Sequence, residues 1–158
     1  MGGYDTHSNQ TDATIIAGAH ADLLTELSTS MFALQRAIEQ IGTTFTGEDP
    51  TLPMKVTSFT ASDFGRTFPT NGSGSDHGWG SHHLIMGGAV QGRKTYGTFP
   101  TLAVSGPDDT SDGRWIPKVS VDQYSATLAR WFGVQPSEIP IVFPNLGRFA
   151  TSDLGFMG

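Results

Sequence analysis

The sequence predicts an α/β fold rich in loops, because two helical patterns are combined with short β-branched runs between glycine-rich segments. Apolar residues recur at helical spacing over residues 20–41 and again over residues 120–132. A β-branched and aromatic run at residues 55–60 is typical of a strand. The chain has 158 residues, including 20 Gly and 9 Pro, and we expect a single domain over residues 1–158.

The first helix is predicted over residues 20–41, after an irregular start at residues 1–18. Apolar residues recur there at three- and four-residue steps and form one stripe: Leu23, Leu24, Leu27, Met31, Leu34, Ile38 and Ile41. We expect Gly42 to end this helix, since glycine is common just past a helix C-terminus.

Strands are predicted from short runs between turn residues. Residues 43–53 contain Gly47, Pro50 and Pro53 and indicate a loop, after which residues 55–60 indicate a strand leading towards Asp63. Further short strands are expected at residues 83–86, within 97–105 and within 137–142, with an acidic turn region at 106–113.

The second helix is predicted over residues 120–132. Ser120 and Gln123 have the spacing of a capping box, in which each side chain binds the backbone N–H of the other residue. Gly133 follows the last apolar residue and is expected to end the helix.

Composition excludes several functional classes. The net charge is −6 with only nine Lys and Arg, so we expect no nucleic-acid surface and no binding to anionic membranes. No apolar run is long enough to span a membrane, and the first residues show no signal-peptide pattern. Cysteine is absent, so any metal ion must be held by His and carboxylate groups.

Residues 62–83 are the segment richest in potential metal ligands: Asp63, Asp76, His77, His82 and His83 lie among Gly, Ser and Asn. Carboxylates and imidazoles bind zinc, manganese and iron, and glycine lets a loop aim several of them at one point. Asp76 and His77 can each supply a ligand, or Asp76 can orient an imidazole. Adjacent strand residues face opposite sides, so we expect only one of His82 and His83 to reach the site.

Three further positions allow both a functional and a structural interpretation. Asp5 and His7 point the same way in an extended chain and could reach one ion, or they could form a surface turn. Asp63 can bind a metal, cap the next turn or pair with Arg66. The planar guanidinium of Arg66 can bind an anionic substrate or a local carboxylate.

Six segments in one order extend over nearly the whole chain: GGYDTHSNQ, SFTASDFGRT, NGSGSDHGWGSHHLIMGGAVQG, YGTFPTLA, GRWIPKVSVDQYSATLARWFGV and VFPNL. Together they resemble the C-terminal half of the bacterial family called domain of unknown function 1501. That family looks like a branch of the alkaline phosphatase and sulfatase superfamily. The resemblance implies an α/β fold with a partial alkaline-phosphatase-like sheet, flanking helices and a metal site at the strand ends.

The resemblance also implies an activity. Superfamily members hydrolyse phosphate or sulfate esters with a Ser, Thr or modified Cys nucleophile beside one or two divalent metals. Carried onto this chain, zinc, manganese or calcium would be bound by Asp5, His7, Asp63 and His77, with His83 or His82 competing for the last place. Arg66 would hold a small anionic ester.

The chain departs from the superfamily pattern at Phe64, where the superfamily often has His, and in the tighter spacing of Asp5 and His7. The nucleophile lies in an N-terminal half that this sequence does not contain, so we expect a fragment of a larger domain. Full-length relatives are expected to be exported to the periplasm.

Two functions follow: a metal-dependent phosphatase or sulfatase-type hydrolase domain, or a non-catalytic remnant or structural metal-binding module. An exposed sheet edge would also favour self-association.

Overall fold

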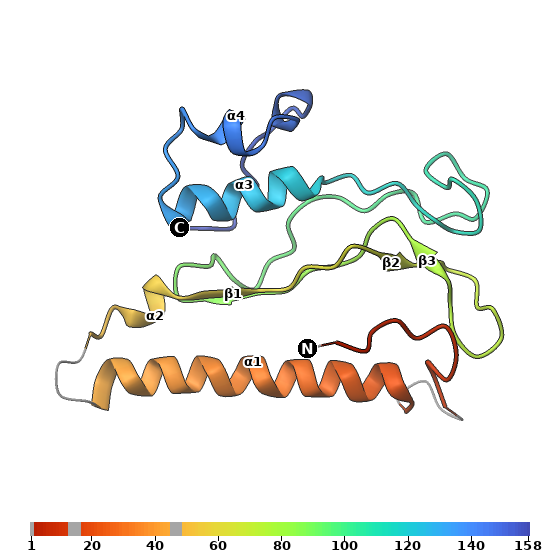
Figure 1. Cartoon of the computed structure of the whole chain (residues 1–158), viewed down its shortest axis with the longest axis horizontal. Helices are drawn as coiled ribbons and strands as arrows, with labels where there is room; N and C mark the ends of the chain where they lie inside the picture. Colours follow the sequence, from red (N-terminus) through yellow and green to blue (C-terminus); the bar gives the residue numbers. More distant parts are fainter. Residues whose placement is uncertain (1, 13–16, 45–48) are drawn as a thin grey trace.

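Helices lie on both sides of a narrow ribbon of short strands in the computed structural model of the chain (Figure 1). The structure describes residues 2–12, 17–44 and 49–158. Parts of the predicted irregular start and of the predicted loop, residues 13–16 and 45–48, lie outside the described residues. The fold is therefore a mixture of helices and small antiparallel sheets, in agreement with the predicted α/β class at that level.

The first helix, α1 (Ala19–Thr44), follows the predicted stripe but continues past Gly42. Gly42 is buried, and a Cβ there would lie 2.9 Å from the backbone oxygen of Asp49 and 3.5 Å from Pro53. The predicted stop at Gly42 was therefore wrong. The glycine instead allows α1 to pack closely against the short helix α2 (Leu52–Lys55).

The second long helix, α3 (Val121–Phe132), begins and ends as predicted. The Ser120 side chain accepts a hydrogen bond from the Gln123 backbone at 3.1 Å, and the Gln123 side chain accepts one from Ser120 at 3.0 Å. Gly133 ends the helix with a φ of 109°, a left-handed conformation that favours glycine. Local sequence signals were sufficient here because every capping group lies within the helix or beside it.

In the part of the chain that the structure describes, the strands pair in two antiparallel sheets of two strands each. The strand β1 (Thr57–Phe59) pairs with β4 (Ile85–Gly87), so both strands occur close to their predicted positions but are shorter. The strand β2 (Gly65–Arg66) pairs with β3 (His77–Gly78), which places Arg66 opposite His77. This second pairing lies inside the ligand-rich segment, residues 62–83. It brings the part of that segment around Arg66 next to the part around His77.

Two predicted strands were wrong. Residues 139–142 form the short helix α4 (Ile139–Val142), because a proline in the first turn suits a helix start and cannot donate to a sheet. Residues 97–105 form no strand. Their backbone N–H groups bind carboxylates of the acidic turn instead, with Thr101 donating to Asp108 and Ser105 donating to Asp109, each at 2.7 Å.

The buried core is small and lies against α3. Ala126, Ile139 and Leu146 form its apolar centre, where α3, α4 and the 3-10 helix η1 (Leu146–Arg148) meet. Phe156, only 1% exposed, packs its ring against Tyr96 and Tyr124 beside this centre. Two further side chains of α3 bind the C-terminal segment, since Gln123 donates to Thr151 at 2.7 Å and Thr127 accepts from Leu154 at 2.9 Å.

The chain exposes more surface than a protein of its mass normally does. Its accessible surface is 10341 Å². A compact monomer of 16.8 kDa would expose about 7,700 Å². Large apolar side chains contribute to the difference, and several are more than two-thirds exposed: Phe32, Phe68, Val121, Phe132 and Ile141. Within the described residues, no helix is both long and apolar enough to cross a membrane.

Candidate metal centre

The N-terminal segment lies against the loop that joins β2 to β3. Arg66 fixes this arrangement, because its guanidinium donates to the backbone oxygens of Tyr4 at 2.5 Å and Ser75 at 2.8 Å. On the other side of the segment, the Tyr4 hydroxyl donates to the backbone oxygen of Leu23 in α1 at 2.9 Å. The segment is thus held between α1 and the β2–β3 hairpin, and Asp5 and His7 are carried towards β3.

A glycine makes the close approach of the two segments possible. Gly74 is buried in the β2–β3 loop, and a Cβ there would clash with the backbone oxygen of His7. Asn71, in the same loop, donates from its side chain to the same His7 oxygen at 3.1 Å. The glycine-rich composition of this loop therefore serves packing of backbone against backbone as well as turning of the chain.

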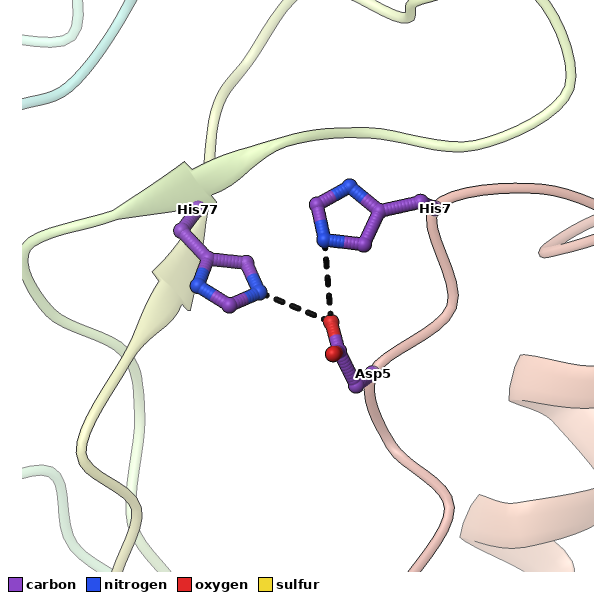
Figure 2. Close-up of side chains that lie close together, drawn as sticks. All are labelled: Asp5, His7 and His77. Atoms are coloured by element: carbon purple, nitrogen blue, oxygen red, sulfur yellow. Dashed lines mark hydrogen bonds and ion pairs between the residues drawn. The ribbon is translucent and has the colours of Figure 1, made fainter.

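Three side chains converge at this contact (Figure 2). Asp5 lies between two imidazoles, with one of its oxygens 2.7 Å from Nε2 of His77 and 3.1 Å from Nε2 of His7. One ligand atom from each residue lies within 4.8 Å of the others. Asp5 and His7 come from the N-terminal segment and His77 from β3, so residues 72 positions apart share the cluster.

The cluster faces solvent, with side chains of Asp5, His7 and His77 that are 60%, 49% and 46% exposed. The hydrogen bond with His77 holds the pKa of Asp5 below its ordinary value, and the charges of His7, His77 and Arg66 act in the same direction. An ionised carboxylate between two imidazoles is the donor set that zinc, manganese or iron binds. The residues present therefore fit such an ion.

Aromatic stacking orients His77. Its ring lies parallel to that of Phe64, with centroids 4.0 Å apart and planes 4° apart. The other neighbour is His7, with ring centroids 4.8 Å apart. The guanidinium carbon of Arg66 lies 4.9 Å from the centre of the Phe64 ring. Phe64, noted in the sequence only as a departure from a pattern, thus supports the cluster through its ring face.

The structure does not bring Asp63 or His83 into this cluster. Asp63 is exposed in the bend after β1. The His83 ring packs against Tyr124 with centroids 5.4 Å apart, and its Nδ1 lies 3.5 Å from the Thr60 hydroxyl. Burial lowers the pKa of His83, and the charge of His82 adds to this effect. His82 itself packs against Phe99.

Arg66 lies beside the cluster, and its Nη2 is 3.5 Å from Asp5. Both terminal nitrogens already bind backbone oxygens, and the side chain is only 18% exposed. An anion would therefore have to share a guanidinium that also holds the N-terminal segment in place.

Asp76 is a neighbour of the cluster that the predicted ligand set left out. Its Oδ1 lies 3.2 Å from Nδ1 of His7 and accepts a hydrogen bond from Asn71 at 3.0 Å. The sequence had suggested that Asp76 could orient an imidazole, and the adjacent His77 was the natural candidate. The imidazole that Asp76 contacts is that of His7, because the loop folds back onto the N-terminal segment.

Tyr124, next to His83, allows a test of pH dependence. Its hydroxyl donates to the backbone oxygen of Thr60 at 3.1 Å, and burial raises its pKa from 10.0 to about 12. The unfolded chain then loses this proton at lower pH than the folded chain does, so the free energy of unfolding should fall between pH 10.0 and about 12. Urea unfolding across this range should show a smaller decline for Tyr124→Phe. Equal declines in the two proteins would contradict the prediction.

These observations define a mixed α/β protein with an exposed Asp-His-His cluster suited to a metal ion. Residues 1–139 match the family described as "Protein of unknown function (DUF1501)", and the chain belongs to that family. The family predicted from the sequence motifs is therefore confirmed. No curated protein and no solved structure matches the chain.

Proposed function

We propose that the chain binds a divalent metal ion through Asp5, His7 and His77. The convergence of one carboxylate and two imidazoles within 4.8 Å is the observation on which the proposal rests. Two nitrogen ligands favour zinc over calcium, which prefers six to eight oxygen ligands. Asp63 and His83 would join as ligands only if the segments after β1 and before β4 moved towards the cluster.

We propose further that the ion serves a hydrolase-type centre acting on a phosphate or sulfate ester. Three protein ligands on an exposed surface leave coordination positions for water and substrate, as catalytic zinc sites do. A metal there would polarise the ester oxygen and lower the pKa of its bound water. Arg66 would contribute positive charge beside the anion. An alkaline-phosphatase-like sheet belongs to the same proposal.

A structural metal-binding module is the second candidate. It is favoured by the way the cluster joins Asp5 and His7 to His77 across 72 positions of sequence. A metal there would cross-link the N-terminal segment to β3 and stabilise the folded chain in proportion to its occupancy. This role would require no nucleophile.

Metal analysis and an esterase assay separate the two candidates. Both candidates require that the purified chain retain zinc or manganese and lose it when Asp5 is replaced by alanine. Only the hydrolase-type centre requires metal-dependent hydrolysis of a generic phosphate or sulfate ester. Hydrolysis that disappears with Asp5→Ala would reject the structural module. Failure to retain any divalent metal would reject both candidate functions. If Asp63→Ala lowered the metal occupancy, Asp63 would be added to the ligand set.

We also propose that the chain associates with a second copy of itself. The surface of one chain exceeds that of a compact monomer by about 2,600 Å², and stable obligate interfaces of about 2,000–5,000 Å² in total bury roughly half of that area on each partner. Sedimentation velocity at micromolar concentration should show dimers or larger species. A stable monomer at that concentration would contradict the proposal.

A further inference from the structure

We propose that Asp76 is a positioning residue, which holds the proton of neutral His7 on Nδ1 and leaves Nε2 unprotonated towards Asp5. The inference deepens the proposed metal site and rests on it for its functional meaning. Its structural content can nevertheless be tested without any metal.

The two nitrogens of His7 face different carboxylates. Nδ1 lies 3.2 Å from Oδ1 of Asp76, and Nε2 lies 3.1 Å from Oδ1 of Asp5. A neutral imidazole has one N–H donor and one nitrogen lone pair, so it can donate to only one of these carboxylates. The choice decides whether Nε2 is available to a metal ion at the cluster.

Asp76 is the better anchored of the two acceptors. Its backbone oxygen accepts from Thr67 at 2.9 Å, and its backbone N–H donates to the Thr67 hydroxyl at 3.1 Å. Thr67 itself is buried. The Asn71 side chain donates to Oδ1 of Asp76 at 3.0 Å and to the backbone oxygen of His7 at 3.1 Å. One amide group therefore fixes both the carboxylate and the backbone of the histidine that it faces.

Hydrogen-bond geometry supports this assignment. Nδ1 of His7 and Oδ1 of Asp76 form a hydrogen bond at 3.2 Å, whereas Oδ1 of Asp5 already forms one with Nε2 of His77 at 2.7 Å. A carboxylate oxygen accepts from the imidazole N–H, so this geometry places the proton of neutral His7 on Nδ1. The lone pair then lies on Nε2, the atom that faces Asp5 and the proposed ion. Carboxylates that bind the second nitrogen of a metal-binding histidine commonly fix its tautomer in this way.

The first experiment is a long-range ¹H–¹⁵N NMR spectrum of the metal-free chain at a pH where His7 is neutral. His7→Gln assigns the signal of His7. The expected tautomer in the unmodified chain is Nδ1–H, and Asp76→Ala should shift it towards Nε2–H. Asp76→Glu should keep Nδ1–H, because it retains an acceptor. Asp122→Ala, which removes an equal charge from α3, should leave the signal unchanged. A neutral His7 with its proton on Nε2 in the unmodified chain would overturn the inference.

The second experiment measures zinc affinity by titration against a chromophoric chelator. Asp76→Ala should weaken zinc binding by about 10- to 100-fold, and Asp76→Glu should recover most of the loss. Loss of binding with no change in the His7 tautomer would overturn the inference and make Asp76 a direct ligand. If zinc fails to bind the unmodified chain although the tautomer shift is observed, the proposed metal site is rejected and the placement of the His7 proton is supported. Unchanged affinity in Asp76→Ala would overturn the positioning role.

Discussion

Replacing His77 with alanine is expected to weaken zinc binding by at least about 100-fold, since loss of a direct ligand exceeds the loss from an outer partner. His77 supplies one of the three converging ligand atoms, and its Nε2 lies 2.7 Å from Asp5. The remaining pair, Asp5 and His7, belongs to one short segment and would bind an ion with two protein ligands. Isothermal titration of the metal-free chain with zinc measures the difference directly.

His82→Ala is the matched control, because it removes the same side chain from the same glycine-rich region. The His82 ring packs against Phe99 and does not belong to the cluster. Its zinc affinity should equal that of the unmodified chain. Equal losses in the two variants would show that the binding seen in solution depends on general folding of the region and not on this cluster. Circular dichroism of both variants verifies that each remains folded.

Replacing Phe156 with alanine is expected to destabilise the chain by about 3–5 kcal/mol. Phe156 is 1% exposed and joins the C-terminal segment to Tyr96 and Tyr124. A loss of this size is a large fraction of the free energy of unfolding of a typical domain, which is about 5–15 kcal/mol. The effect should be large here because few other buried apolar side chains support the fold. Urea unfolding followed by circular dichroism gives the difference.

Phe132→Ala provides the control for Phe156→Ala, since the same atoms are removed from a ring that is 83% exposed at the end of α3. We expect its free energy of unfolding to change by less than about 0.5 kcal/mol. Both variants should be measured at the same protein concentration, because self-association would couple stability to concentration. A Phe156→Ala variant as stable as Phe132→Ala would show that the C-terminal segment does not contribute to the core in solution.

The helices show which structural features were predictable from local sequence. The ends of α3 depend on Ser120, Gln123 and Gly133, which interact with the helix itself, so the pattern predicted them correctly. Gly42 was misinterpreted because α1 continues past it, and its role is close packing against α2 and not termination. Residues 139–142 were also misinterpreted. A short apolar run is compatible with a strand or with a helix, and Pro140 in the first turn suits the helix.

For the candidate site, the sequence supplied the ligand types and their neighbourhood. His77 was recognisable as a candidate ligand from its glycine-rich neighbourhood, whereas Asp5 and His7 entered the predicted set through the family resemblance. The predicted set also included Asp63 and His83, which the structure leaves outside the cluster. The contact of Asp76 with His7 was not predictable, since nothing in their separation of 69 positions indicates that they meet.

The composition and the local motifs of this chain were enough to establish its family, its acidic charge, its long helices and the chemical nature of its candidate ligands. The selection among those ligands came from tertiary contacts. Arg66 binds the backbone of Tyr4, the buried Gly74 admits the backbone of His7, and the pairing of β2 with β3 places His77 at the same point. Long-range contacts of this kind depend on where distant segments meet in space, and a pattern of neighbouring residues contains no measure of that distance.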